Sequence, residues 1–456
     1  MNKKNDVKKG KNLRQVNSIT SVTVSGYKSI NQPQTVEIRP LTIIAGANSS
    51  GKSSIIQPLL LLKQTLEESF DPGPLQLDGK NVNFTSASQF LPRVSKNDNI
   101  VPFSIGLEIA PNLKLAIEFH KQSSRKLEIK KMTYDNGEEK LALRLDMNQR
   151  EIEEGLPKGL KNLPQLLSER EKTPWEWEVI RQRCFLALAL RSKDKSGVRF
   201  PMISRVSPSG IAETYLRGLI HVPGLRGNPE RYSPVAAIGE NFPGRFENYT
   251  ASVISRWQEE SPKKISALGK DLAQIGLTWK VIATPINDTQ VELQVGRLSQ
   301  AASGGAKDLV NIADVGFGVS QTLPVLVALH VAEPGQLVYI EQPEIHLHPR
   351  AQTAMANVLA DAAKRGVRVI IETHSSLLLL GIQTLIAEEK LSPDLVKLHW
   401  FSRDENGATS VRSAELDEVG AFGDWPVDFA ETSLKAQSRY LDAAEAKMMG
   451  NGNGLR

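Results

Sequence analysis

The segment that most constrains this chain is a glycine-rich loop placed between a strand and a helix. The loop is Gly46-Ala47-Asn48-Ser49-Ser50-Gly51-Lys52-Ser53, a complete GxxxxGK[ST] pattern. An apolar run (41–45) precedes it, and a run rich in Leu and Ile (54–66) follows it. In such a loop the backbone N–H groups wrap phosphates, the lysine reaches the terminal phosphates and the last hydroxyl ligates Mg²⁺. The pattern predicts a site for ATP or GTP that extends through Ser54.

Length and composition limit the remaining choices. A chain of 456 residues can bury one large core or two to three smaller ones. Its single cysteine, Cys184, excludes an intrachain disulfide and agrees with a reducing compartment. Apolar runs such as 59–62 and 377–380 are far too short to cross a bilayer. We therefore expect a cytoplasmic protein without a membrane partner.

The formal charge of +5 is concentrated at the N-terminus. The first fourteen residues are polar and basic, which predicts disorder. Such a tail could contact nucleic acid or remain solvated without a partner, and the sequence leaves both open. Because the remainder is close to neutral, charge alone does not predict binding to nucleic acid.

The pattern of apolar residues predicts strands and helices in a particular order. Alternation predicts strands within 19–44, hairpin strands at 102–109 and 113–120, and a further strand at 126–134. The charged stretch 141–190 is expected to be helical. Helices are predicted at 246–258, 263–275, 320–331 and 350–364, and strands at 278–284, 289–295, 336–340 and 367–371. Helices alternating with continuous apolar strands indicate a parallel sheet covered on both faces.

Two of these apolar strands end in side chains that suit a phosphate site. One ends in Glu341, the position of a Walker B acid, which can hold Mg²⁺ directly or through water. The other leads to His374, where an imidazole can hydrogen-bond the γ-phosphate. We expect both side chains to lie beside the phosphate loop.

The order of these motifs resembles the head of ABC-type ATPases, in the soluble group that includes the SMC, RecF and OLD-type proteins. The segments PEIHLHPR (343–350) and ETHSS (372–376) resemble sequence motifs of that group. The text at 416–429, together with GLRGNPERY (224–232), resembles a bacterial AAA-labelled subfamily that ends in a domain of unknown function. The resemblance covers residues 18–435.

The resemblance implies further site residues. In that group a signature at a helix start packs on the γ-phosphate held by the opposing subunit. Here its place is taken by Gly316, Phe317, Gly318, Val319 and Ser320, of which Gly316, Gly318 and Ser320 would contact nucleotide. The text departs from LSGGQ, so the contacting residue is open. Gln89 is the candidate for the glutamine that approaches the metal.

The position after the Walker B acid also departs from the group. A glutamate that polarises the attacking water is usual there, but this chain has Gln342. An amide can position water but cannot accept its proton at neutral pH. Glu344 or His374 could take over, which predicts slow hydrolysis.

The resemblance thus implies an α/β fold, a P-loop ABC-type ATPase head with a mainly parallel sheet plus a mixed α+β insertion. Its expected parts are a disordered basic tail (1–17), an N-terminal half (18–140), a helical or mixed insertion (141–300), a C-terminal half (301–435) and a flexible tail (436–456). The expected function is slow hydrolysis of Mg-ATP by a head-to-tail homodimer. Such a dimer would control a separate effector, for example a nuclease or toxin, in phage defence or DNA repair.

Two other functions stay open. Gln342 favours a scaffold that binds ATP, scarcely hydrolyses it and presents a partner protein. An ABC transporter ATPase is disfavoured by the missing LSGGQ and the long insertion. A GTPase is disfavoured because no NKxD motif follows the phosphate loop.

Overall fold

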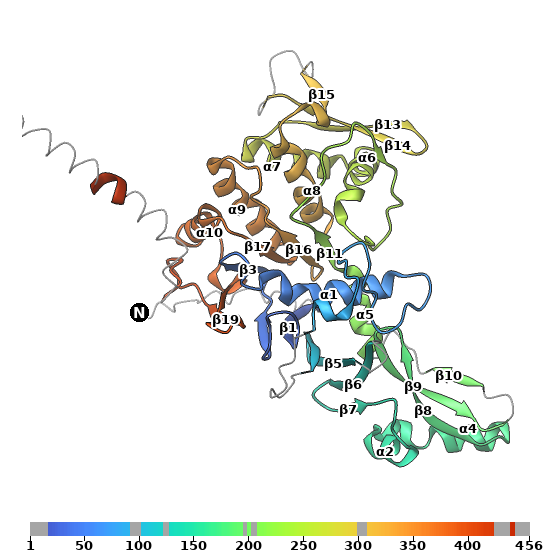
Figure 1. The fold of residues 1–456 in the computed structure, drawn as a ribbon. Helices are drawn as coiled ribbons and strands as arrows, with labels where there is room; N and C mark the ends of the chain where they lie inside the picture. The colour runs from blue at the N-terminus through green and yellow to red at the C-terminus, as the bar shows by residue number, and fades with distance from the viewer. Residues whose placement is uncertain are drawn as a thin grey trace, which may run out of the picture.

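The computed structural model describes residues 17–91, 102–121, 127–194, 198–201, 208–298, 308–423 and 438–442 (Figure 1). The predicted basic tail, except its last residue, lies outside the described residues, and so does most of the predicted C-terminal tail. None of the described helices is both long and apolar enough to cross a bilayer.

A six-stranded, mainly parallel sheet forms the centre of the molecule (Figure 1). Its order is β11 (Ile220–Val222), β16 (Leu337–Glu341), β17 (Arg368–Glu372), β3 (Leu41–Gly46), β18 (Val396–Arg403) and β19 (Thr409–Ala414). All neighbouring pairs are parallel except β18 and β19. The inner strands β16, β17 and β3 are largely apolar and buried because both faces of the sheet are covered. The predicted α/β class with a mainly parallel sheet is confirmed.

Helices cover both faces of this sheet and create two cores. Ile43 and Ile340 point into the core shared with five helices, and Ile44 and Tyr339 point into the core shared with α1. This alternation follows from the two-residue repeat of a strand. The helices of the first core are α6 (Thr250–Glu260), α7 (Pro262–Ile275), α8 (Phe317–Val331), α9 (Pro349–Lys364) and α10 (Ser376–Ala387). Helix α1 (Lys52–Glu67) and α5 (Pro208–Gly218) belong to the second core.

A second, antiparallel sheet packs on the other side of α1. Its order is β2 (Gln34–Glu37), β1 (Ile19–Ser25), β4 (Phe103–Ile109), β5 (Leu113–Lys121), β6 (Leu127–Asp135) and β7 (Lys140–Leu143). Buried residues alternate with half-buried or exposed residues along β4 and β5, as expected for a sheet with one covered face. The predicted hairpin is confirmed.

The stretch 141–190 is only partly helical, and the prediction for its second half is wrong. Short helices α2 (Gln149–Gly155), α3 (Lys158–Lys161) and α4 (Leu163–Glu171) occupy its first half. Strands β8 (Trp175–Gln182), β9 (Phe185–Ser192) and β10 (Arg199–Pro201) follow as a three-stranded antiparallel sheet. The reason is a period of two: the buried Trp177 and Val179 alternate with the half-buried Glu176 and Glu178. These elements form an arm that extends away from the parallel sheet (Figure 1).

The later part of the expected insertion packs with the parallel sheet. Strand β11 is an edge strand of that sheet, and α6 and α7 overlap the predicted helices 246–258 and 263–275. A four-stranded sheet contains β12 (Ser233–Pro234), β14 (Gln290–Gly296), β13 (Val281–Asn287) and β15 (Leu309–Asn311). The 3-10 turns are η1 (Ala87–Gln89), η2 (Phe246–Tyr249), η3 (Ile312–Asp314) and η4 (Pro393–Leu395). The interval 141–300 therefore holds both the arm and elements of the central core.

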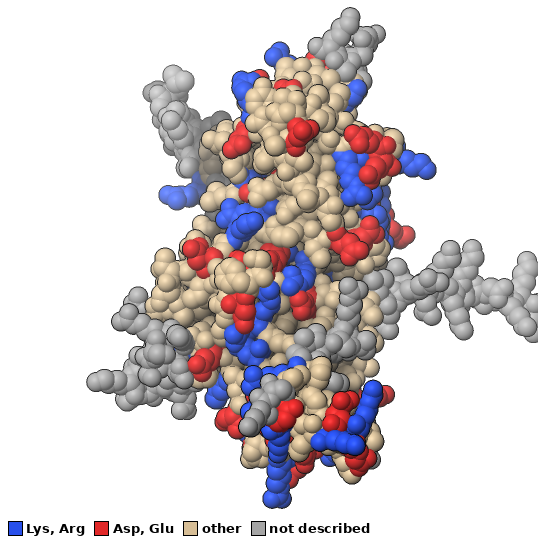
Figure 2. Space-filling model, turned by 90° about the vertical axis from the view of Figure 1, so that its right-hand side faces the viewer, with Lys and Arg blue, Asp and Glu red and all other residues tan. Residues whose placement is uncertain are grey.

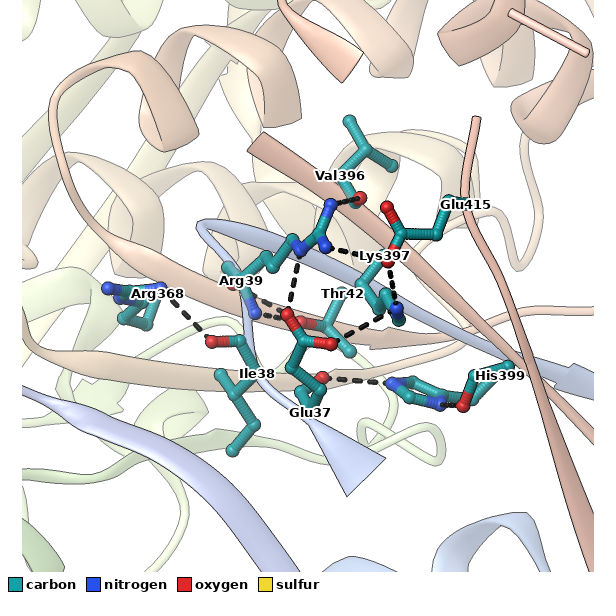
Figure 3. A network of polar contacts seen from close by, with 10 residues as sticks. Glu37, Ile38, Arg39, Thr42, Arg368, Val396, Lys397, His399 and Glu415 are labelled. Carbon is teal, nitrogen blue, oxygen red and sulfur yellow. Dashed lines mark hydrogen bonds and ion pairs between the residues drawn. The ribbon is translucent and has the colours of Figure 1, made fainter. Parts of the chain in front are cut away.

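A polar network joins the two large sheets where the parallel strands begin (Figure 3). Arg39 and Lys397 each contact both Glu37 and Glu415 at 2.7–3.0 Å. The buried His399 faces the Glu37 carbonyl through Nε2 and the Ser413 hydroxyl through Nδ1, each at 2.8 Å. This end of the sheet is held by paired charges.

Candidate functional site

The phosphate loop connects the end of β3 to the start of α1, as predicted, and its shape requires two glycines. Gly46 has a φ of 147°, and a Cβ there would lie 2.2 Å from the Phe401 carbonyl oxygen. Gly51 has a φ of 98°, and a Cβ there would lie 2.3 Å from the Thr409 hydroxyl. That hydroxyl donates to the Ser50 carbonyl at 2.9 Å. Strands β18 and β19 therefore hold the loop in shape.

The remaining loop residues are placed as a phosphate cradle requires. Ala47, Asn48 and Ser49 are exposed at its tip, with Ser49 at a φ of 60°. Ser54 lies in the first turn of α1, and its N–H donates to the Gly51 carbonyl at 3.0 Å. The N–H groups at the start of an α-helix have no partner within the helix, so they can serve an anion.

Lys52 lies over this loop. Its ammonium donates to the Gly46 carbonyl at 3.1 Å and to the Ala47 carbonyl at 2.8 Å. Burial lowers its pKa, and the charge of Glu372 opposes that shift. The ammonium can exchange these two carbonyls for phosphate oxygens without leaving the loop.

The carboxylate in contact with the loop hydroxyl is Glu372, to which the sequence assigned no role. Ser53 Oγ donates to Glu372 Oε2 at 2.9 Å. The hydroxyl of Tyr339 donates to the other carboxylate oxygen. Burial, and then the charge of Glu341, raise the pKa of Glu372 to about 7. The available signal was that Glu372 ends an apolar strand just as Glu341 does.

Glu341 ends β16 as predicted, and its carboxylate turns toward β11. Its Oε2 accepts from the Gly224 N–H at 2.9 Å, and its Oε1 lies 3.4 Å from His221 Nε2. Burial raises its pKa, but the hydrogen bonds and charge of His221 outweigh burial, so the pKa of Glu341 is lowered overall. Glu341 and Glu372 are direct partners in the register of β16 and β17.

The loop after α1 reaches this site through Asn81, whereas Gln89 does not take the predicted place. The Gln89 side chain accepts from the N–H groups of Thr85 and Ser86 and so caps its own 3-10 turn. Asn81 Oδ1 lies 3.0 Å from His221 Nδ1, and the His221 ring stacks on Tyr339. Nothing in the local sequence distinguishes Asn81, because its importance comes from His221, more than a hundred residues later.

Arg226, within the text GLRGNPERY, ties the Walker B strand to α8. Its guanidinium donates to the carbonyls of Gln321 at 2.7 Å and Glu341 at 2.8 Å. The Gln321 amide donates back to the Arg226 carbonyl at 3.1 Å. Burial lowers the pKa of Arg226 to about 10, and nearby carboxylates oppose that shift. The buried Arg226 side chain therefore connects the end of the Walker B strand to α8.

Gln342 and Glu344 lie on the sharp turn that follows β16. Gln342 has a φ of 46°, and its N–H donates to the Glu372 carbonyl at 2.8 Å. Glu344 Oε1 accepts from the Thr373 hydroxyl and from the His374 N–H, both at 2.8 Å. Its buried Oε2 has no hydrogen-bond partner among the described residues, and burial raises its pKa. Glu344 is thus directed at the His374 segment.

His374 follows β17 and has an exposed side chain. Burial of part of the ring, and then the charge of Lys52, lower its pKa. The imidazole is therefore neutral at pH 7 and can accept or donate one hydrogen bond. His374 therefore lies within range of the Lys52 charge, and its N–H donates to Glu344.

The candidate signature forms the start of α8. Gly316 is its N-cap without a side-chain cap, and a Cβ there would have open space around it. A Cβ at Gly318 would lie 3.3 Å from the His346 carbonyl oxygen. The exposed ring of Phe317 packs against the ring of His346, with centroids 5.5 Å apart. Ser320 Oγ donates to the Phe317 carbonyl at 3.1 Å.

Two family models match the two parts of this site. A model described as "AAA ATPase domain" matches residues 18–178, which include the phosphate loop. A model described as "AAA domain, putative AbiEii toxin, Type IV TA system" matches residues 233–380, which include α8, β16 and His374. Both models describe AAA ATPase domains, so this chain is similar to such domains on either side of its middle part. The prediction of an ATP-binding ATPase is therefore confirmed at this coarse level.

Solved structures similar to this chain include three SMC heads. An SmcHead bound to the C-winged helix domain of ScpA has 13% identity and a TM-score of 0.42, over 88% of this chain and 98% of that chain. The SMC head domain from Thermotoga maritima has 8% identity and a TM-score of 0.36, over 88% of this chain and 100% of that chain. An Smc head domain with an extended coiled coil, bound to the C-terminal domain of ScpA and derived from Pyrococcus furiosus, has 11% identity and a TM-score of 0.41. This match covers 93% of this chain and 100% of that chain. No curated protein matches the sequence of the chain.

Proposed function

We propose that this ATPase head pairs head-to-tail with a second copy around two Mg-ATP molecules, hydrolyses them slowly and thereby controls a separate effector. The observation that carries the proposal is the uncapped start of α8 at Gly316, with Phe317 exposed beside it. Free N–H groups at a helix start suit an anion. In this proposal that anion is the γ-phosphate held by the phosphate loop of the partner copy.

Residue roles follow from the described contacts. Lys52 and the loop N–H groups bind the terminal phosphates. The Ser53 hydroxyl and the carboxylate of Glu341 are hard oxygen donors of the kind that Mg²⁺ prefers, so the residues present fit this ion. Mg²⁺ bound there neutralises phosphate charge. His374, neutral at pH 7, hydrogen-bonds the γ-phosphate.

Glu344 is the group that we assign to the attacking water. Its Oε2 is free of hydrogen bonds to the described residues, and its Oε1 is fixed beside the His374 N–H. Burial raises the pKa of Glu344 toward the range of a general base. Gln342 contributes hydrogen bonds to water but no proton acceptance. A base displaced by two residues accounts for slow turnover.

The first test is phosphate release by the wild type, Lys52→Ala and Glu344→Gln, with Glu388→Gln on the surface as the control. We expect no turnover in Lys52→Ala and a decrease of about 100-fold or more in Glu344→Gln, the usual contribution of a general base. Turnover unchanged in Glu344→Gln would remove Glu344 from this role.

Head-to-tail pairing is tested by mixing two inactive variants. Lys52→Ala lacks a phosphate-binding lysine, and Ser320→Arg blocks the start of α8. A mixed dimer contains one intact site, made from the loop of one chain and the signature of the other. We expect the mixture to recover part of the activity and to form ATP-dependent dimers in light scattering. No recovery, with each variant folded, would contradict shared sites.

The alternative function is a scaffold locked by ATP, which Gln342 favours. It predicts an ATP-bound dimer whose phosphate release does not exceed that of Lys52→Ala. The same two measurements therefore decide between the two functions.

The effector is proposed as a separate chain, a nuclease or toxin in phage defence or DNA repair. The second family model carries the word toxin in its description, which is the support for a toxin. We propose 18–140 and 301–435 as the two halves of the head and 141–300 as the insertion, which includes the arm formed by α2–α4 and β8–β10 (149–201). Nucleic acid stays a possible partner. On the face seen in Figure 2, however, the described Lys and Arg side chains lie among Asp and Glu side chains.

A further inference from the structure

We infer that Glu372 is an additional ligand of the metal site, so that two neighbouring strands each supply one carboxylate. This inference rests on the proposed binding of Mg-ATP at the phosphate loop. It concerns a residue of β17, one strand nearer to the loop than the Walker B strand β16.

The contact between Ser53 and Glu372 has the spacing of two metal ligands. Ser53 Oγ and Glu372 Oε2 lie 2.9 Å apart. Neighbouring oxygens of a Mg²⁺ octahedron, with Mg–O bonds of about 2.0–2.1 Å, are separated by about 2.9 Å. The hydrogen bond can therefore be exchanged for coordination with little movement of either heavy atom.

The order of strands favours Glu372 over Glu341 for direct contact with the loop. Strand β17 lies between β16 and β3, and β3 leads into the phosphate loop. Adjacent strands are about 4.8 Å apart, so Glu341 starts one strand farther away. The oxygens of Glu341 are also engaged by Gly224 and His221 on the side of β11.

A purely structural role for Glu372 is the competing explanation. In that case the carboxylate would only accept hydrogen bonds from Ser53 and Tyr339, and a neutral amide could replace it. Yet Glu372 is buried opposite a second carboxylate, and the described contacts include no ion pair to it. A buried carboxylate without a paired cation is costly, whereas a bound cation compensates for it.

The test separates metal binding from nucleotide binding in the full-length protein. The affinity for a fluorescent, non-hydrolysable ATP analogue is measured in EDTA and then across a Mg²⁺ titration, and Mn²⁺ binding is followed by electron paramagnetic resonance. For Glu372→Gln we expect the wild-type affinity in EDTA and a requirement for about 10- to 100-fold more Mg²⁺ or Mn²⁺. The control is Glu37→Gln at the opposite end of the sheet, which should match the wild type.

A metal requirement unchanged in Glu372→Gln would overturn the inference and leave Glu372 with a structural role. Failure of the wild type to bind the analogue, with or without metal, would instead contradict the proposed function. If Glu372→Gln does not fold, Glu372→Asp keeps the charge but withdraws it by one methylene. We then expect weaker Mg²⁺ binding with a relative gain for the larger Ca²⁺, and no change in either would also overturn the inference.

Discussion

Charged side chains gather at both ends of the parallel sheet, and the two ends differ in how these charges are compensated. Where the strands begin, Arg39 and Lys397 are shared between Glu37 and Glu415 (Figure 3). Burial raises the pKa of Glu37, but these cations outweigh burial and lower it overall. Hydrogen bonding to Lys397 lowers the pKa of Glu415.

Where the strands end, Glu372 and Glu344 are buried, and burial raises the pKa of each. Lys52 is near, but its hydrogen bonds go to loop carbonyls. The carboxylates where the strands begin are therefore compensated by cations of the chain itself. Those where the strands end would be stabilised by an added cation. Perturbed carboxylates of this kind are typical of functional sites.

The largest effect is expected for the lysine at the phosphate end. Lys52→Ala should weaken ATP binding by about 30-fold or more, since removing one partner of a buried charged contact costs about 2–5 kcal/mol. Fluorescence titration with an ATP analogue measures this change. Lys397→Met is the matched variant at the other end and should leave the affinity unchanged. Equal losses in both variants would erase the functional distinction between the two ends.

The next effect concerns pH and His399. Burial lowers the pKa of the folded His399 from 6.5 to about 4. Between these values the unfolded chain binds a proton that the folded chain does not, so the free energy of unfolding decreases as pH falls from 6.5 to 4. The shift corresponds to about 3 kcal/mol.

His399→Gln should remove most of this pH dependence, as measured by urea denaturation at several pH values. His120→Gln, at a partly exposed position, is the control and should retain it. A pH dependence that survives in His399→Gln would place its origin elsewhere.

A smaller effect is expected for the cation of the opposite network. Lys397→Met leaves Glu37 and Glu415 with Arg39 alone among the cations described here. Because both carboxylates are about half exposed, we expect a loss of about 1–2 kcal/mol rather than the full cost of a buried pair. Thermal denaturation measures it, and an unchanged melting temperature would show that the network adds no stability.

The smallest effect should have the opposite sign. In EDTA at pH 8, Glu372→Gln should raise the free energy of unfolding by about 1 kcal/mol, because it removes a buried carboxylate opposite Glu341. The gain is limited since the hydrogen bonds from Ser53 and Tyr339 are weaker to an amide. Glu415→Gln should decrease stability instead. Destabilisation by both substitutions would mean that the two ends are compensated alike.

Sequence predicted the parts of the site whose signals are local. The phosphate loop is continuous in sequence, Glu341 ends an apolar strand and His374 lies two residues after another, so the edge of the sheet on which they meet could be inferred. Gln89 was misplaced because a loop gives no indication of which polar side chain turns inward. The helix prediction missed strands β8 and β9. In β8, Glu residues alternate with Trp177 and Val179, and this charged stretch was interpreted as a helix.

The position of β3 in the parallel sheet determines which parts of the chain can fold first during synthesis. This strand lies between β17 and β18, which begin at Arg368 and Val396. The antiparallel sheet, by contrast, is complete by Leu143. As the polypeptide leaves the ribosome, that sheet can form early, while the phosphate loop must wait for neighbours made much later. Nascent chains are therefore unable to capture nucleotide until nearly all of the described fold has been synthesised.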